Sequence, residues 1–278
     1  MKRILTAIVL IPIVLFLVFL PAWAQWIFTL LTALVACLAA WEFLTIAHRT
    51  GAKPPRIAVL IAIFALFAAN YQWPDQTVVS VGILGIGLLV YCTFASPVSR
   101  VLADAATSIF CLGYIGYTLM TLPALREQAN GPSLLVFLLC VVWAGDIAAL
   151  YAGRLFGRHK LAPSISPGKT WEGAIASLFG SLVVAAALLA ISQHLLSHWD
   201  SVVLSYHDEV WWYWLILAAI VNIAAQVGDL AESALKRSAG VKDSGTLLPG
   251  HGGFLDRIDA LLLAAPVLWY AQIIHQRF

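Results

Sequence analysis

The residues best suited to chemistry lie in one polar segment near the end of the chain. It opens on Asp229, and its charged side chains recur at steps of three or four residues. Such steps place side chains on one face of a helix. The side chains related in this way are Asp229, Glu232, Ser233, Lys236 and Arg237. A solvated amphipathic helix with one Glu232–Lys236 pair would show the same spacing, so the pattern alone leaves both interpretations open.

A turn-rich run follows this segment and leads into a second helix. Its centre reads Pro-Gly-His251-Gly252-Gly253. Glycines let backbone N–H groups approach an anion closely, and successive N–H groups can form an anion-binding nest. Carboxylates beside such donors and beside cations are what a magnesium–phosphate site requires. A glycine-rich loop that only caps a helix would look similar. The flanking charged residues are Lys242, Asp243, Asp256, Arg257 and Asp259.

A second polar loop reads Ser166-Pro-Gly-Lys169-Thr170-Trp-Glu172-Gly173. Gly-Lys-Thr suggests a P-loop, but the first glycine of that motif falls on Pro163 and no strand is expected before it, so we reject this interpretation. A lysine on a short loop before a helix can still bind phosphate.

A third candidate, Asp146, lies inside an apolar run. A charge in a membrane span is costly and marks a functional residue by default, although a structural ion pair is the alternative.

The composition sets these loops in a membrane protein. Of the 278 residues, 62% are hydrophobic and 11% are charged, and the mean hydropathy is +0.90. A soluble domain could not cover so much apolar surface, and disordered chains are poor in apolar residues. The net charge of +2 is too small to indicate nucleic-acid binding. The four cysteines stand singly in apolar runs and are interpreted as core thiols.

The apolar runs predict an all-α, polytopic membrane protein with about nine transmembrane helices. We expect a single transmembrane domain over 1–278, with N-terminal spans in 1–132 and catalytic spans and loops in 133–278. The expected spans lie near 4–20, 23–46, 57–70, 77–95, 101–122, 133–153, 173–193, 210–228 and 258–275.

The basic residues predict the orientation of these spans. Of the 16 Lys and Arg residues, all but Arg126 and Arg277 would lie on the side of the amino terminus. Because cytoplasmic loops are enriched in Lys and Arg, the amino terminus and both polar loops are expected in the cytosol. Glu42 and Asp104 fall near cytosolic span ends and are expected to reach the membrane interface.

The segment Ser233 to Asp259 resembles the signature of the phosphatidate cytidylyltransferases, the CDP-diacylglycerol synthases. It reads S-A-L-K-R-S-A-G-V-K-D-S-G-T-L-L-P-G-H-G-G-F-L-D-R-I-D. Ser166–Gly173 is similar to that family's Ser-Pro-x-Lys-Thr-x-Glu-Gly run. Asp146–Gly157 is similar to its Asp-x-x-Ala-x-x-x-Gly-Arg-x-x-Gly stretch, with departures at Ile147 and Leu150. The specific likeness covers about 146–259, and the first five spans match only in being apolar.

The resemblance implies an enzyme that condenses CTP with phosphatidate, releasing pyrophosphate and forming CDP-diacylglycerol. It implies that Asp229 and Asp256 hold Mg²⁺, with K⁺ beside it, in a homodimer of the inner membrane whose active site faces the cytosol. Asp243 and Asp259 would orient cations. Positive charge would come from Lys169, Lys236, Arg237, Lys242 and Arg257, and hydrogen bonds from His251, Gly252 and Gly253. The remaining substrate-binding candidates are Asp146, Ser166, Thr170, Glu172 and Ser233.

Three other functions are alternatives to this one. A CTP-dependent kinase or cytidylyltransferase for a polyprenol or ether lipid would share the polar loops. A transporter would also bury charges, but it would show inverted repeats in both halves, whereas the polar residues here crowd into the second half. A structural scaffold would need neither polar loop.

Overall fold

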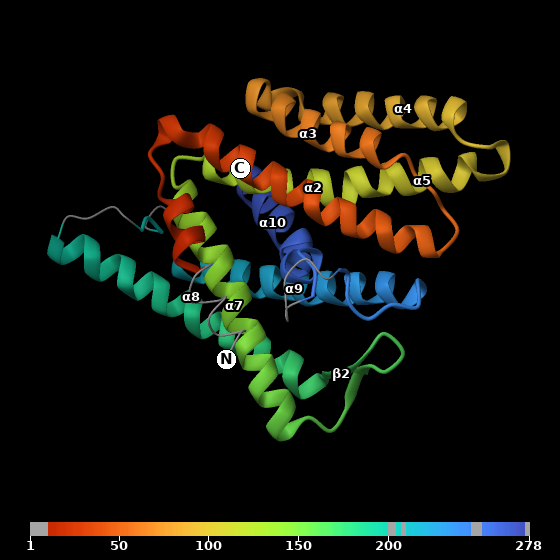
Figure 1. The fold of residues 1–278 in the computed structure, drawn as a ribbon. Helices are drawn as coiled ribbons and strands as arrows, with labels where there is room; N and C mark the ends of the chain where they lie inside the picture. The colour runs from red at the N-terminus through yellow and green to blue at the C-terminus, as the bar shows by residue number, and fades with distance from the viewer. Residues whose placement is uncertain (1–10, 200–203, 207–209, 246–251, 276–278) are drawn as a thin grey trace. The chain divides into compact units, whose positions relative to one another are not determined.

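The computed structural model describes residues 11–199, 204–206, 210–245 and 252–275, and these residues are predominantly helical (Figure 1). Helices dominate because a chain inside a bilayer must satisfy its backbone hydrogen bonds within the segment. The helical elements are η1 (Ala22–Ala24), α2 (Gln25–Arg49), α3 (Arg56–Gln72), η2 (Pro74–Gln76), α4 (Thr77–Ala95), η3 (Val98–Arg100), α5 (Val101–Cys111), η4 (Leu112–Tyr117), α6 (Thr118–Arg126), α7 (Gly131–Phe156), α8 (Trp171–Trp199), α9 (Trp211–Ser238) and α10 (Leu255–His275).

These helices confirm the all-α membrane class. In the described part of the chain, seven helical segments are long and apolar enough to cross a membrane. The helix at the expected 57–70 span, α3, is apolar but has only 17 residues. Residues 4–10 of the expected 4–20 span lie outside the described residues, and residues 11–18 are helical. The total of nine spans and the cytosolic amino terminus therefore stay predictions.

The chain divides into two compact units. The first comprises residues 1–124 and 235–262, and the second comprises 125–234 and 263–278. The sequence prediction of one domain with a boundary at 132 is not tested by this division. Both α9 and α10 contribute residues to both units, so the polar segment singled out in the sequence is shared between them.

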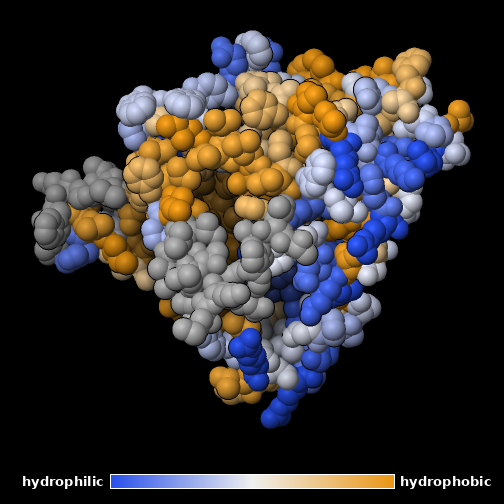
Figure 2. All heavy atoms as spheres, in the orientation of Figure 1, coloured by the Kyte–Doolittle hydropathy of each residue, from blue (hydrophilic) through white to orange (hydrophobic). Residues whose placement is uncertain are grey.

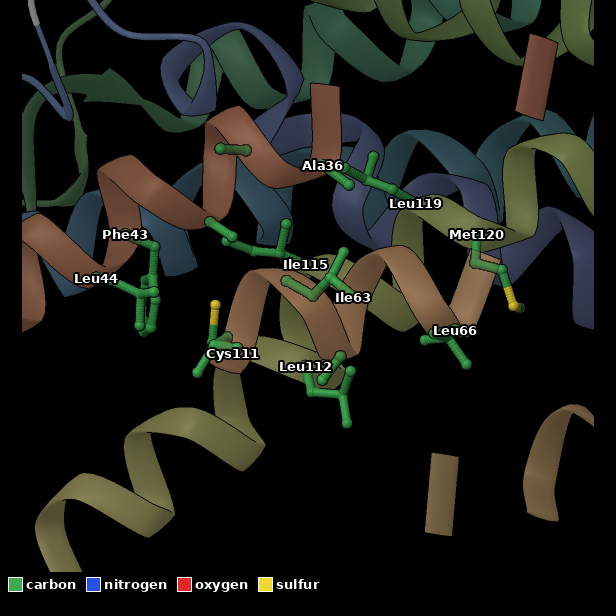
Figure 3. Packing of buried hydrophobic residues seen from close by; sticks show 14 of the residues in the cluster. Ala36, Phe43, Leu44, Ile63, Leu66, Cys111, Leu112, Ile115, Leu119 and Met120 are labelled. Atoms are coloured by element: carbon green, nitrogen blue, oxygen red, sulfur yellow. The ribbon is translucent and has the colours of Figure 1, made fainter. Parts of the chain in front are cut away.

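The core of the first unit is built on small residues of α2. Ala36 and its neighbours Ala33, Ala39 and Ala40 are buried and let α3 and η4 approach closely. Ile63, Ile115 and Leu119 fill the space beside them (Figure 3). The six residues of η4 form a π-helical turn between α5 and α6. This packing fixes the end of α2 that carries Glu42.

Large apolar side chains cover much of the visible surface (Figure 2). On α4 the exposed fraction reaches 86% at Phe94 and 80% at Val78. Exposed apolar area of this extent suits contact with lipid chains.

The second unit is held by a polar junction inside its helices. Asn222 of α9 donates hydrogen bonds to the hydroxyls of Ser177 and Ser181 on α8, at 2.9 and 2.8 Å. Gln226 donates to the Asn222 carbonyl oxygen at 2.7 Å. Gly145 of α7 lies directly against this junction, where a Cβ would collide with the Asn222 amide. The junction positions α7, α8 and α9, the helices that carry Asp146 and Asp229.

Between α7 and α8 the chain forms a small antiparallel hairpin, β1 (Lys160–Ala162) and β2 (Ser166–Thr170). Lys160 pairs with Thr170, and the Trp171 N–H donates to the His159 carbonyl at 2.9 Å. The expectation of a plain loop without a strand is therefore wrong, because the backbone satisfies its polar groups by pairing. Pro163 still excludes a P-loop. Lys169 lies on β2, so its backbone is fixed.

Candidate active site

In the first unit, Asp256 is the centre of a hydrogen-bonded cluster. Its Oδ1 accepts from Lys236 Nζ at 2.6 Å, and its Oδ2 accepts from the backbone N–H groups of Ser244 and Gly253 at 3.0 and 2.8 Å. The side chains of Lys236 and Asp256 are only 11% and 10% exposed. A buried charge requires a partner and hydrogen bonds, and this pair has both. The turn-rich run and the end of α9 are thus tied to the start of α10.

Glu42 of α2 completes this cluster. Its Oε1 accepts from the Phe254 N–H at 3.1 Å, and its Oε2 accepts from the Leu255 N–H and the Ser244 hydroxyl at 2.9 and 3.0 Å. Glu42 is 3% exposed, so the expectation that it simply reaches the membrane interface is wrong. The carboxylate is buried because three donors from the signature segment replace water around it.

The same expectation is wrong for Asp104, which is fully buried. Its Oδ1 accepts from the Lys53 N–H at 2.6 Å and its Oδ2 from the Ser96 hydroxyl at 2.7 Å, with Arg100 Nε 3.8 Å away. These partners join the segments that flank α3, α4 and α5. Asp104 is therefore a structural residue of the first unit, and these three partners lie outside the signature segment.

The glycines of the turn-rich run are needed for close approach. Gly252 has a φ of +77°, a conformation that other residues rarely adopt. A Cβ on Gly245 would stand 2.5 Å from Glu42 Oε1, and a Cβ on Gly253 would collide with Glu42 Oε2 and Ser244 Oγ. Glycine was expected here to bring the backbone near an anion. The anions that it approaches in this structure are the protein's own carboxylates.

A cavity of about 320 Å³ opens beside this loop. Thr45, Ile46 and Arg49 of α2 line one side, and residues 241–245 line the other. Arg49, Lys242 and Asp243 are exposed, so the lining carries two positive charges and one negative charge. Arg237 donates to the Val241 carbonyl at 3.0 Å and so supports the loop.

Of the other predicted residues, Arg257 is exposed, Asp259 accepts from the Ala260 N–H at 2.7 Å, and His251 lies outside the described residues.

A second cluster lies in the second unit, around Asp229 of α9. Lys169 Nζ of β2 lies 2.7 Å from Asp229 Oδ2, and the Ser233 hydroxyl donates to Oδ1 at 3.5 Å. Asp146 of α7 lies close enough to interact electrostatically with both Asp229 and Lys169. The two signature-like stretches around residues 146 and 169 therefore meet at Asp229. Two carboxylates lie near one lysine here, so the cluster can accept further positive charge.

The hairpin that carries Lys169 is braced by other residues predicted to bind substrate. Glu172 accepts from the N–H groups of Arg158 and His159, and its Oε1 lies 2.6 Å from His159 Nδ1. The Thr170 hydroxyl accepts from the Gly173 N–H at 3.2 Å at the start of α8. These bonds give Glu172 and Thr170 a role in positioning the hairpin. His159 was missed in the sequence because a lone exposed histidine carries no distinctive pattern. Ser166, at the start of β2, is half-buried.

The residues assigned to Mg²⁺ by resemblance, Asp229 and Asp256, belong to different units. Each carboxylate pairs with a lysine ammonium group, which shows that each position favours a cation. Within the described residues, no three His, Cys, Asp or Glu side chains converge as a metal-binding group. Mg²⁺ typically takes only one or two protein carboxylates and completes its shell with water and phosphate oxygens. Taken separately, each residue therefore has the donor chemistry for a Mg²⁺ ion that also binds a phosphate-bearing substrate.

The fold and the two clusters define a polytopic membrane protein in which two carboxylates, Asp229 and Asp256, are each paired with a lysine. Comparison with known proteins shows which family of membrane proteins this is. Residues 1–274 match the model of the cytidylyltransferase family, and the chain belongs to this family.

Similar proteins include two that align over nearly the whole chain. Proteins named phosphatidate cytidylyltransferase from Haemophilus influenzae and Pseudomonas aeruginosa are 32% and 36% identical to it, with 97% of each chain covered. A protein of the same name from Brucella suis is 44% identical over 163 residues. That match spans 57% of this chain and about half, 54%, of the Brucella protein.

Proposed function

We propose that this chain transfers the cytidylyl group of CTP to phosphatidate, giving CDP-diacylglycerol and pyrophosphate. The observation that carries the proposal is the signature segment itself, whose Lys236, Ser244 and Asp256 form one buried cluster. Family membership and relatives of that name over nearly the full length support the same activity. Nothing in the two clusters favours a polyprenol or ether lipid as the acceptor.

The chemistry asks mainly for charge neutralisation. The phosphate of phosphatidate is already ionised, so no strong general base is required. Its oxygen would attack the α-phosphorus of CTP, and the bond to the β-phosphate oxygen would break to release pyrophosphate. The obstacle is the meeting of two polyanions, which fixed cations and backbone donors overcome by positioning and electrostatic stabilisation. Lys169, Lys236 and Lys242 are the lysines of the clusters and the cavity that can supply this charge.

Asp229 and Asp256 would contribute carboxylates to Mg²⁺, and K⁺ would lie nearby, as the resemblance implies. When bound, Mg²⁺ would neutralise phosphate charge and polarise the phosphoryl group. Ser244 and Gly253 would hold the Asp256 carboxylate through its Oδ2, leaving Lys236 on Oδ1. Lys169 would hold the Asp229 carboxylate by pairing with its Oδ2, as Lys236 pairs with Asp256.

We also propose that the protein works as a homodimer in the inner membrane, with its site facing the cytosol. The distribution of Lys and Arg supports the orientation, since 14 of the 16 basic residues fall on one side of the predicted spans. Seven candidate spans and bacterial relatives support a multi-pass membrane protein. CTP would then reach the polar loops from the cytosol.

The test uses purified protein in detergent with phosphatidate, Mg²⁺ and CTP labelled at the α-phosphorus, with and without EDTA. Label should enter the lipid fraction with an equal amount of pyrophosphate, and EDTA should stop it. CTP labelled at the γ-phosphorus should leave the lipid unlabelled. Transfer of the γ-label would instead identify a kinase, and transfer only to a polyprenol or ether lipid would replace the acceptor.

A further inference from the structure

The buried carboxylate of Glu42 accepts hydrogen bonds from the signature segment, which lies more than 200 residues further along the chain. Its partners Ser244, Phe254 and Leu255 all lie in that segment, whereas Glu42 lies on α2. All four residues belong to the first unit. Nothing in the sequence around Glu42 links it to the second half of the chain.

Glu42 acts on the start of α10 as a cap supplied by another helix. The first N–H groups of a helix have no partner within it, and they carry partial positive charge. Phe254 and Leu255 donate theirs to Glu42, and Gly253 donates to Asp256. Asp256 reaches back three residues to do so, as the acidic member of a capping box does. The two carboxylates therefore divide three successive N–H groups between them.

Ser244 links the two carboxylates directly. Its hydroxyl donates to Glu42 at 3.0 Å, and its backbone N–H donates to Asp256 Oδ2 at 3.0 Å. The glycine on each side of the link, Gly245 and Gly253, leaves no room for a Cβ against Glu42. A displacement of Glu42 would therefore move the donors that orient Asp256.

We propose that Glu42 is a positioning residue for the cytidylyl transfer reaction, because it fixes the loop and helix start that aim the Asp256 carboxylate. This inference rests on the proposed function. Glu42 does not touch the reacting atoms. It determines whether Asp256 is presented in one fixed geometry for the cation and phosphate.

The test compares Glu42→Gln with the wild-type protein. Glutamine keeps the shape but offers one acceptor oxygen, so one of the two N–H groups at Phe254 and Leu255 must face an NH₂ group. We expect kcat to fall by about 10- to 100-fold and the Mg²⁺ concentration for half-activation to rise, as happens when groups that orient a metal ligand are removed. Hydrogen exchange at Phe254 and Leu255 should become faster.

Asp104→Asn is the matched control. Asp104 is also a buried carboxylate that accepts a backbone N–H and a seryl hydroxyl, but its partners lie outside the signature segment. It should lower thermal stability while kcat per folded molecule and the Mg²⁺ dependence stay near wild type. A purely structural role for Glu42 predicts the same behaviour for both variants.

Each outcome decides one point. A folded Glu42→Gln protein with wild-type kcat, Mg²⁺ dependence and exchange would overturn the inference. If Glu42→Gln does not fold, Ser244→Ala removes only the linking hydroxyl, and an unchanged kcat and Mg²⁺ dependence in that variant would overturn it equally. If the wild type transfers no cytidylyl group, the proposed function fails. The exchange rates at Phe254 and Leu255 then test the positioning role separately.

Discussion

Asp256 and Glu42 show how two carboxylates of a membrane protein can share one set of hydrogen-bond donors. Each carboxylate is buried or nearly so, and each accepts backbone N–H groups from the start of α10. Lys236 adds a charged partner, at 2.6 Å from Asp256. Removing a member of such a set leaves a buried donor or charge without its partner, which costs more than the bond contributes.

Asp256→Asn should abolish cytidylyl transfer while the protein stays folded. The variant keeps the size of the side chain but removes the charge that pairs with Lys236 and would hold Mg²⁺. We expect turnover to fall by about 10³-fold or more. The labelled-CTP assay measures turnover, and circular dichroism and yield report folding. Near-normal turnover in a folded variant would exclude Asp256 from the site.

Gly253→Ala should disturb the same cluster sterically. A Cβ there collides with Ser244 Oγ and Glu42 Oε2, both of which are buried and fixed. Overpacking of this kind costs about 1–3 kcal/mol, so the melting temperature and the activity should both fall. Gly87→Ala on α4 is the control, since its Cβ would meet nothing within 4 Å. Equal stability of the two variants would contradict the packing described here.

The sequence predicted the residues of the signature cluster but not all of their partners. Lys236 and Asp256 were recognisable because motif and charge coincide in one segment. The role of Glu42 could not be predicted, since a single acidic residue near a span end usually reaches water and its donors lie more than 200 residues away. Its burial follows from tertiary packing, which local patterns do not encode.

At the scale of elements, the hairpin β1–β2 and the junction at Asn222 position the second cluster. The hairpin carries Lys169 to Asp229, and Glu172 fastens its base through the Arg158 and His159 N–H groups. The junction joins α8 to α9 by hydrogen bonds inside the membrane region. The sequence predicted these helices from their apolar runs. It did not predict the hairpin, because three- and five-residue strands are too short for a periodic signal.

Asn222→Ala should weaken the second unit. The change removes the donor to Ser177 and Ser181 and the acceptor of Gln226. Hydrogen bonds between membrane helices contribute about 0.6 kcal/mol each on average and up to about 1.7, so we expect a loss of about 1–2 kcal/mol in the free energy of unfolding. Unfolding in mixed micelles measures this value. An unchanged midpoint would show that the junction adds no stability.

At the scale of the whole molecule, the long apolar helices give the chain its class, and the basic residues predict its direction. Hydropathy predicts spans well because every span must meet the same length and polarity requirement. It is weaker at the amino terminus and at α3, whose 17 residues fall short of a full-length span. The predicted orientation of the chain in the membrane depends on the number of spans, so the orientation needs a separate measurement.

Cysteine labelling provides that measurement. Ser164, at the exposed tip of the hairpin, and Ala129, in the exposed turn before α7, stand at the two ends of one span. A membrane-impermeant maleimide should label Ser164→Cys only from the cytosol and Ala129→Cys only from outside. The native cysteines lie in candidate spans, and Cys92 and Cys111 are buried, so background labelling should be low. The reverse pattern would invert the predicted orientation.

The separation of 202 residues in sequence between Glu42 and Ser244 also sets the order in which the two residues are synthesised. Ribosomes add roughly 5–20 residues per second, so α2 is made roughly 10–40 s before the donors of Glu42 exist. During that interval the carboxylate must be accommodated by water, lipid headgroups or the insertion machinery, because its own chain has not yet supplied the Ser244, Phe254 and Leu255 donors. During biogenesis the Glu42 carboxylate therefore lacks these donors until the chain reaches Leu255. In a nascent chain that ends before Ser244, it never acquires them.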